Sequence, residues 1–164
     1  MRVYCFAFGK LKTPGLRDTI DHYKRHLSPW IEFIEEELKP IPVPDKSPAT
    51  RLKIQNQEAE LLENKFASRL SSRAWIYLLD EKGKALPTQG WSQLVNTWEN
   101  QSIPEVAWCI GSSLGFHSSL HKRAKGILSF GPQTLPHELA RVLLTEQLFR
   151  AWSITRNHPY HVEG

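Results

Sequence analysis

Cysteine is scarce in this sequence of 164 residues: only Cys5 and Cys109 are present, each within an apolar stretch. Two isolated cysteines provide neither a disulfide framework nor a Cys-x-x-Cys metal motif, so we expect two buried thiols. The sequence also lacks a run of about 18 apolar residues, which a membrane-spanning helix requires. A strand-like segment stands at the amino end in place of a secretory signal. These absences predict a cytoplasmic protein that does not bind a membrane.

Strong compositional bias and internal repeats are absent as well. Hydrophobic residues make up 40% of the chain and charged residues 23%, which is ordinary for a soluble globular domain. A chain of this length buries roughly 68–70% of its unfolded surface without help from cross-links. We therefore expect one domain over residues 1–164. The net charge of +4 favours a polyanionic partner without identifying it.

Short apolar stretches alternate with segments that have helical spacing. Strands are expected at residues 3–8, 30–38, 75–79, 106–110 and 127–130, and helices at residues 15–27, 51–70, 91–98 and 137–152. Residues 80–83 are expected to form a turn, and the proline-rich residues 40–48 a linker. The alternation predicts an α/β fold with a mostly parallel sheet.

The last expected helix has two apolar faces. One face carries Leu139, Val142, Leu143 and Phe149, and the other carries Leu144, Leu148 and Trp152. A helix on the rim of a monomer needs only one apolar stripe. The helix is therefore expected to lie between two surfaces, the second being another layer or another subunit.

Polar residues at the end of this helix carry two further expectations. Glu146 lies on an apolar face one turn before Arg150, so the two side chains are expected to pair. Residues 153–161 hold an arginine, two histidines and a tyrosine, whereas frayed ends are usually small and polar. This tail is expected to dock on a surface.

Charged residues in the first quarter of the chain allow two interpretations. Basic residues near the first strand and helix would either be solvated or contact an RNA backbone. An acidic run would repel phosphate and should face away from it. The basic residues are Lys10, Lys12, Arg17, Lys24 and Arg25, and the acidic ones are Glu35, Glu36 and Glu37.

Three loops follow expected parallel strands, at residues 79–83, 110–115 and 130–135. In open α/β sheets, ligands collect outside the carboxyl ends of the strands. The loops are rich in glycine, proline or small residues, which let a backbone approach a ligand closely. They would suit a small ligand, and each could equally be a simple turn.

The segment TLPHEL followed by RVLLTEQLFRAWSITRNHPYH closely resembles the C-terminal signature of a SPOUT-class methyltransferase family. The resemblance covers the whole chain, because AFGKLKTPGLRDTIDHYKRHLSPWIEFIEEEL and LLDEKGK occur in the expected order. Members methylate N3 of a pseudouridine in large-subunit ribosomal RNA. The resemblance implies a homodimer with a SPOUT-type α/β fold and a deep C-terminal trefoil knot. It also implies S-adenosylmethionine as cofactor and ribosomal RNA, within the assembled ribosome, as partner.

The resemblance further implies which residues contact the cofactor: Leu79, Gly111, Phe130, Gly131, Pro132, Gln133, Thr134 and Leu135. The family usually has a second glycine and a proline or alanine after Gly111, where this chain has Ser112, Ser113 and Leu114. Ser112 adds a Cβ where backbone approaches the ligand. The alternative is therefore a non-catalytic RNA- or ribosome-binding relative with an impaired cofactor loop.

The implied reaction needs a base or a cation, because N3 of a pseudouridine must lose its proton. The candidates are His137, Arg141, Arg156, His158 and His161, while Tyr160 could stack on a flipped base. His158 and His161 lack a carboxylate or cysteine partner, so no metal site is expected. Arg141→Ala and His161→Ala are expected to lower methylation in a folded dimer, and Leu148→Asp to break the dimer.

Overall fold

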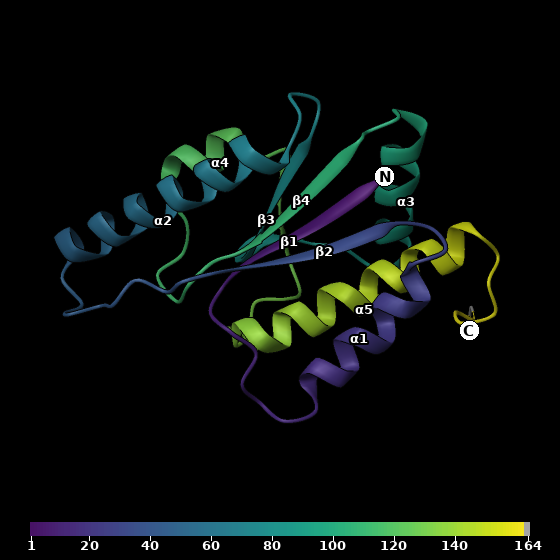
Figure 1. Ribbon diagram of the computed structural model, residues 1–164, viewed down its shortest axis with the longest axis horizontal. Coiled ribbons are helices and arrows are strands. Elements are labelled where there is room, and N and C mark those ends of the chain that lie inside the picture. Colours follow the sequence, from purple (N-terminus) through teal and green to yellow (C-terminus); the bar gives the residue numbers. More distant parts are fainter. Residues whose placement is uncertain (163–164) are drawn as a thin grey trace.

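The computed structural model describes residues 1–162 and contains a five-stranded sheet in which neighbouring strands are parallel (Figure 1). The strand order is β2-β1-β4-β3-β5. The strands are β1 (Arg2–Phe8), β2 (Glu32–Leu38), β3 (Trp75–Ala85), β4 (Glu105–Ile110) and β5 (Gly126–Ser129). The α/β prediction with a parallel sheet is confirmed.

Helices cover both faces of the sheet. They are α1 (Leu16–Leu27), α2 (Pro48–Arg69), α3 (Thr88–Asn100), α4 (Ser118–Arg123) and α5 (His137–Thr155). Along β1, Val3 and Cys5 pack with α1, α3 and α5, whereas Tyr4 and Phe6 pack with α2 and α4. This alternation follows from the two-residue period of a strand. Figure 1 shows α2 and α4 together on one side and α1 with α5 on the other.

Helix α4 was not expected, and several expected bounds differ from the structure by two or three residues, as in α3 and at the end of α5. Two of the differences have a clear cause. Helix α2 begins at Pro48, three residues early, because Ser47 accepts a hydrogen bond from the Thr50 N–H and proline is tolerated at the first helical position. Residues 80–83 do not end the strand. They form an irregularity inside β3, with Leu79 and Lys84 both paired to Leu128. The turn-forming residues make a bulge because β5 extends the ladder beyond them.

Both cysteines are buried free thiols, as expected. Within residues 1–162, no helix is long and apolar enough to cross a bilayer. Over the same residues, no group of three or more His, Cys, Asp or Glu side chains is placed to hold a metal ion.

Candidate functional site

The three loops expected to hold a ligand gather at one edge of the sheet. One is the irregular part of β3, and the other two follow β4 and β5; the strands are parallel, so their carboxyl ends share that edge. The Thr134 hydroxyl donates to the Glu81 carboxylate at 2.5 Å, which joins the loops after β5 and within β3. A Cβ at Gly115 would lie 3.9 Å from the Asp80 carboxylate, which places the loop after β4 beside them.

The loop after β5 holds most of the residues expected to contact a cofactor. Gly131 has a φ of +122°, which favours glycine, and a Cβ there would meet open space. The Ser129 hydroxyl donates to the Gly131 carbonyl at 2.6 Å and accepts from its N–H at 2.9 Å. Phe130 stacks on Trp91, with ring centroids 5.6 Å apart. The exposed part of the loop consists of Pro132, Gln133 and Thr134, while Leu135 is half-buried.

The other two cofactor candidates lie at strand ends. Leu79 is half-buried at the bulge of β3. Gly111 follows β4 and packs against a ring, since a Cβ there would lie 3.0 Å from the Phe116 side chain. The next residue, Ser112, points its hydroxyl at Glu58 of α2. The expected cofactor residues are thus brought to one edge.

His137 begins α5 at the same edge and is half-buried. Its ring lies against the end of β1, because a Cβ at Gly9 would be 2.8 Å from the His137 Nε2. Burial disfavours the imidazolium and lowers the pKa of His137, and its Nδ1 has no hydrogen-bond partner among the described residues. A neutral imidazole in this place could accept a proton.

Glu138 ties this end of α5 to the segment after β1. Its carboxylate accepts the backbone N–H groups of Thr13, at 3.0 Å, and Lys12, and also the Thr13 hydroxyl. These hydrogen bonds lower the pKa of Glu138 to about 2. The carboxylate also suits the positive end of the helix dipole.

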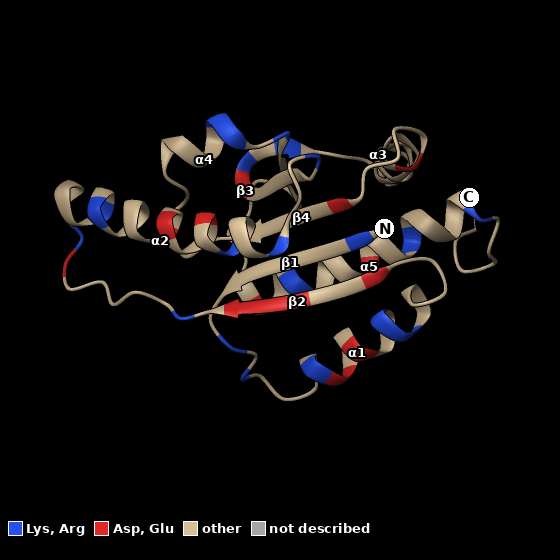
Figure 2. Cartoon of the chain, turned by 45° about the horizontal axis from the view of Figure 1, so that its top comes forward, with Lys and Arg blue, Asp and Glu red and all other residues tan. Residues whose placement is uncertain are grey.

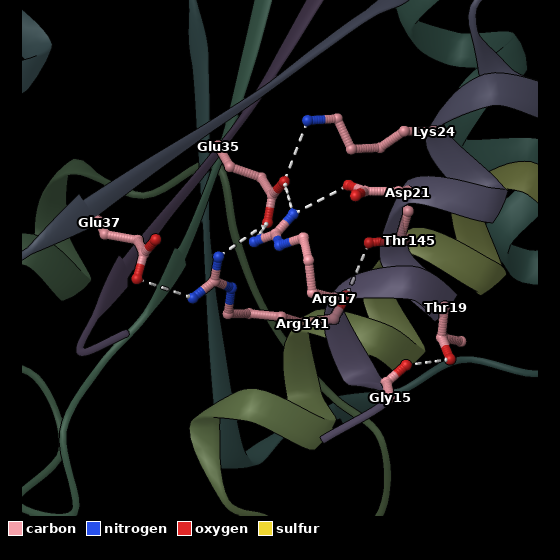
Figure 3. A network of polar contacts seen from close by, with 9 residues as sticks. All are labelled: Gly15, Arg17, Thr19, Asp21, Lys24, Glu35, Glu37, Arg141 and Thr145. Atoms are coloured by element: carbon pink, nitrogen blue, oxygen red, sulfur yellow. Dashed lines mark hydrogen bonds and ion pairs between the residues drawn. The ribbon is translucent and has the colours of Figure 1, made fainter. Parts of the chain in front are cut away.

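Arg141 lies one turn further along α5 and is 1% exposed (Figure 3). Its Nη2 donates to Glu35 Oε1 at 2.7 Å, and its Nη1 is 3.5 Å from Glu37 Oε2. Glu35 also accepts from Arg17 at 2.8 Å and Lys24 at 3.0 Å. Burial alone would raise the pKa of Glu35, but these three cations hold it at about 2.

The acidic run is therefore neutralised within the chain. Figure 2 shows it on β2, an edge strand of the sheet. Glu36 pairs with Lys65 at 3.0 Å and Arg69 at 2.7 Å, both on α2. Arg17 and Lys24, two of the basic residues near the first strand and helix, form ion pairs with Glu35. Those two are less available to an RNA backbone than the sequence suggests.

The tail after α5 docks as expected, and the surface is its own helix. The Glu146–Arg150 pair is confirmed, with Arg150 Nε 2.9 Å from Glu146 Oε1. The Tyr160 hydroxyl donates to the same oxygen at 3.0 Å, and its ring packs on Phe149 at 4.4 Å. His161 Nδ1 lies 3.2 Å from Arg150 Nη1.

Two further tail candidates contact other elements. Arg156 pairs with Glu99 of α3, its Nη1 lying 3.2 Å from Glu99 Oε2. His158 is exposed and meets the edge of Trp30 at 5.7 Å. Figure 1 shows that α5 ends near the amino ends of β1 and β2, and Trp30 directly precedes β2.

A single chain does not bring all of the catalytic candidates together. His137 and Arg141 lie in the first part of α5, which directly follows the loop after β5, whereas Arg156, His158, Tyr160 and His161 follow its end. The 19 residues of α5 span about 28 Å at a rise of about 1.5 Å per residue. The tail of one chain is too far from its own cofactor loops to act there.

The apolar faces of α5 are covered only in part. Leu144, Leu148 and Trp152 are fully buried in the core with the sheet and α3, and Phe149 packs on the rings of α1 and Trp30. Leu139 and Leu143 are 42% and 38% exposed. The expectation that Leu148→Asp would act on a subunit contact is therefore wrong, because Leu148 belongs to the core of its own chain.

Two surface hollows lie away from the cofactor loops. One lies at the amino ends of β1 and β2, beside Trp30 and Pro104. The other lies between β2 and α2, beside Leu38 and Leu61. Neither hollow is lined by the residues expected to bind the cofactor or to act in catalysis. The strand-end loops, in contrast, lie next to His137, whose Nδ1 has no hydrogen-bond partner among residues 1–162.

Sequence reasoning missed one buried carboxyl near these loops. Glu58 of α2 is 3% exposed and contacts Ser112. The available signal was its position between Ile54 and Leu62, because a glutamate on the apolar stripe of a helix needs a polar partner.

Comparisons with known proteins identify the family of this chain. A family model described as "Predicted SPOUT methyltransferase" matches residues 1–161. A protein of Streptococcus uberis named "Ribosomal RNA large subunit methyltransferase H" is 35% identical over 98% of this chain and 99% of its own length. The protein of that name from Streptococcus pyogenes serotype M3 is 36% identical over the same shares. The chain is thus an enzyme of the methyltransferase class and belongs to the SPOUT methyltransferase family, alongside these relatives.

Proposed function

We propose that this protein transfers a methyl group from S-adenosylmethionine to N3 of a pseudouridine in large-subunit ribosomal RNA. The observation that carries the proposal is the gathering of three loops at the carboxyl edge of a parallel sheet, next to His137. The relatives named as ribosomal RNA large subunit methyltransferases match along nearly the whole chain, which supports the same substrate class.

The loops suit a cofactor with an adenine and an amino-acid moiety. The space where a Cβ of Gly131 would lie is open, and the half-buried Leu79 and Leu135 offer apolar contact. Leu79, Gly111 and residues 130–135 would hold the cofactor. When bound, it supplies an electrophilic methyl group on a sulfonium. We further propose that residues 130–135 belong to a trefoil knot, as the family resemblance implies.

Positioning and proton removal are the tasks left to the side chains. Holding donor and acceptor in line can contribute roughly 7–11 kcal/mol. His137 is the residue we propose as base, because its lowered pKa keeps it neutral and its Nδ1 is unpartnered among residues 1–162. A positioned base typically adds about 10²–10⁴-fold.

The separation along α5 supports a homodimer. If the α5 helices of two copies run antiparallel, the tail of one copy lies beside the cofactor loops of the other. Arg156, His158, Tyr160 and His161 would then reach the RNA base held at the partner's edge. Exposed Leu139 and Leu143 provide apolar surface for such a contact.

Two measurements test the function. Calorimetric titration with S-adenosylmethionine is expected to show one site per chain. Mass spectrometry of ribosomal RNA from cells lacking this protein is expected to show the loss of one methyl group from a pseudouridine. Restoring the methyl group in vitro with free RNA or with assembled ribosomes distinguishes the two substrates. RNA binding without cofactor binding would support the non-catalytic alternative instead.

Tyr160→Ala is expected to lower kcat/KM for the RNA substrate by about 5- to 150-fold, because stacking on a base is worth roughly 1–3 kcal/mol. Tyr160→Phe keeps the ring but loses the hydrogen bond to Glu146, so it controls for the docking of the tail. The two variants are compared in a methylation assay, with the affinity for S-adenosylmethionine measured in parallel. Equal losses in both variants would assign the effect to tail docking and contradict a stacking role.

A further inference from the structure

Three side chains of α2 hold the loop after β4. Arg51 donates to the Leu114 carbonyl from Nε at 3.1 Å and Nη2 at 2.9 Å. Gln55 donates to the same carbonyl at 2.7 Å. Glu58 accepts the Ser112 hydroxyl at 3.1 Å. Residues 51, 55 and 58 are spaced four and three apart, so they share one face of the helix.

Ser112 is the centre of this loop. Its hydroxyl donates to Glu58 and accepts from the Leu114 N–H at 3.3 Å, and its carbonyl accepts from the Gly115 N–H at 3.3 Å. The serine side chain is therefore turned toward α2. A Cβ at Gly115 would lie 3.9 Å from both Gln55 and Asp80, so the loop lies between α2 and the bulge of β3.

Packing does not explain why a carboxyl occupies position 58. Glu58 is 3% exposed and lies between the buried Ile54 and Leu62. Its Oε1 is buried and has no hydrogen-bond partner within residues 1–162. Burial raises the pKa of Glu58, which shows that the site disfavours a charge. An apolar residue would pack there at lower cost. Within residues 1–162, the hydrogen bond that Glu58 makes is to Ser112.

We propose that Glu58 is a positioning residue that acts through Ser112 to hold residues 111–115 in the shape that binds the cofactor. This inference rests on the proposed function, because it assigns the loop to the cofactor site. Its consequence is that Ser112 does not impair the loop. The hydrogen bond from the Ser112 hydroxyl to Glu58 restricts the conformations of the loop. Ser112→Gly loses this bond and should therefore weaken cofactor binding. An impaired loop would respond in the opposite direction.

Calorimetric titration of the full-length protein with S-adenosylmethionine tests the pair. Glu58→Ala, Ser112→Ala and Ser112→Gly are each expected to raise Kd about tenfold, the equivalent of one hydrogen bond of about 1–1.5 kcal/mol. The double variant Glu58→Ala/Ser112→Ala is expected to equal Ser112→Ala, because Ser112→Ala already removes the contact with Glu58. Glu58→Gln keeps an acceptor and should stay within about threefold of the wild type.

Glu60→Gln is the matched control, since Glu60 is exposed on the same helix. KM for the RNA substrate is expected to stay unchanged in every variant, which a general loss of structure would not allow. Additive losses in the double variant would overturn the proposal, as would wild-type affinity in Ser112→Ala or tighter binding in Ser112→Gly. If Glu58→Ala unfolds, Ser112→Ala and Glu58→Gln still decide the matter. Absence of binding by the wild type would instead refute the proposed function.

Discussion

Glu35→Ala is expected to lower the free energy of unfolding by about 3–5 kcal/mol, the cost of breaking a buried ion pair from one side. The variant leaves the guanidinium of Arg141, which is 1% exposed, with only the 3.5 Å contact to Glu37. It also leaves Arg17 and Lys24 close together without the carboxylate that separates them (Figure 3). Urea unfolding at pH 7 measures the loss.

The same loss should shrink in acid. The pKa of Glu35 is about 2 in the folded protein, below the ordinary value of 4.5. A lowered carboxyl pKa contributes stability above pH 4.5, and this contribution is lost as the pH falls from 4.5 toward 2. The wild type and Glu35→Ala are therefore expected to differ less at pH 3 than at pH 7.

Glu32→Ala is the control on the same strand. Its partner Arg2 is 3.8 Å away, and both side chains are more than half exposed, so the effect should be within about 0.5 kcal/mol. A double variant, Glu35→Leu/Arg141→Met, is expected to recover most of the stability, because both buried charges are removed together. A Glu35→Ala protein as stable as Glu32→Ala would contradict the role of this network.

The ion pairs of Glu35 affect how the methylation rate of the Arg141→Ala variant is interpreted. The sequence-based expectation was a folded dimer with reduced methylation. Because Arg141 is buried and bound to Glu35, we now expect the alanine variant to lose stability as well. The folded fraction must be measured beside the methylation rate. A catalytic role for Arg141 stays a prediction.

Periodicity in the sequence predicted the strands and helices but not which surfaces meet. The alternation along β1 and the two faces of α5 follow from local spacing. The pairing of Glu35 with Arg141 joins residues 106 apart, and no local pattern contains that information. The acidic run was therefore expected only to face away from phosphate, without a partner for it in the chain. The bulge of β3 was missed for a similar reason, since it depends on how far β5 extends the ladder.

The candidate site shows the same limit. Glycines after expected strands located three loops at one edge of the sheet, because parallel strands end at one edge. That these loops hold a cofactor stays a prediction. The motif at the end of the chain suggested that tail and loops act together, yet the length of α5 separates them. A second copy could place its tail beside these loops only through a contact between subunits. The fold identifies Leu139 and Leu143 as the apolar residues of α5 that stay exposed for such a contact.

In the proposed homodimer, Leu143→Asp is expected to raise the dimer dissociation constant by at least about 100-fold while leaving the chain folded. Leu143 is 38% exposed in the single chain, so it tolerates a charge there. In a two-fold symmetric interface each substitution acts twice, and each buries a charge against the partner's apolar surface. Methylation should fall with dissociation, because the partner's tail would no longer reach the cofactor loops.

Leu148→Asp is compared with Leu143→Asp, because Leu148 is fully buried in its own chain. An aspartate there is expected to unfold the protein, since an unpaired buried charge costs more than a single domain usually has in reserve. Circular dichroism separates the two variants, and light scattering gives their oligomeric state. A folded Leu143→Asp protein that is still dimeric and active would place the subunit contact on another surface. It would also require the tail to reach the RNA by a route other than the partner's edge.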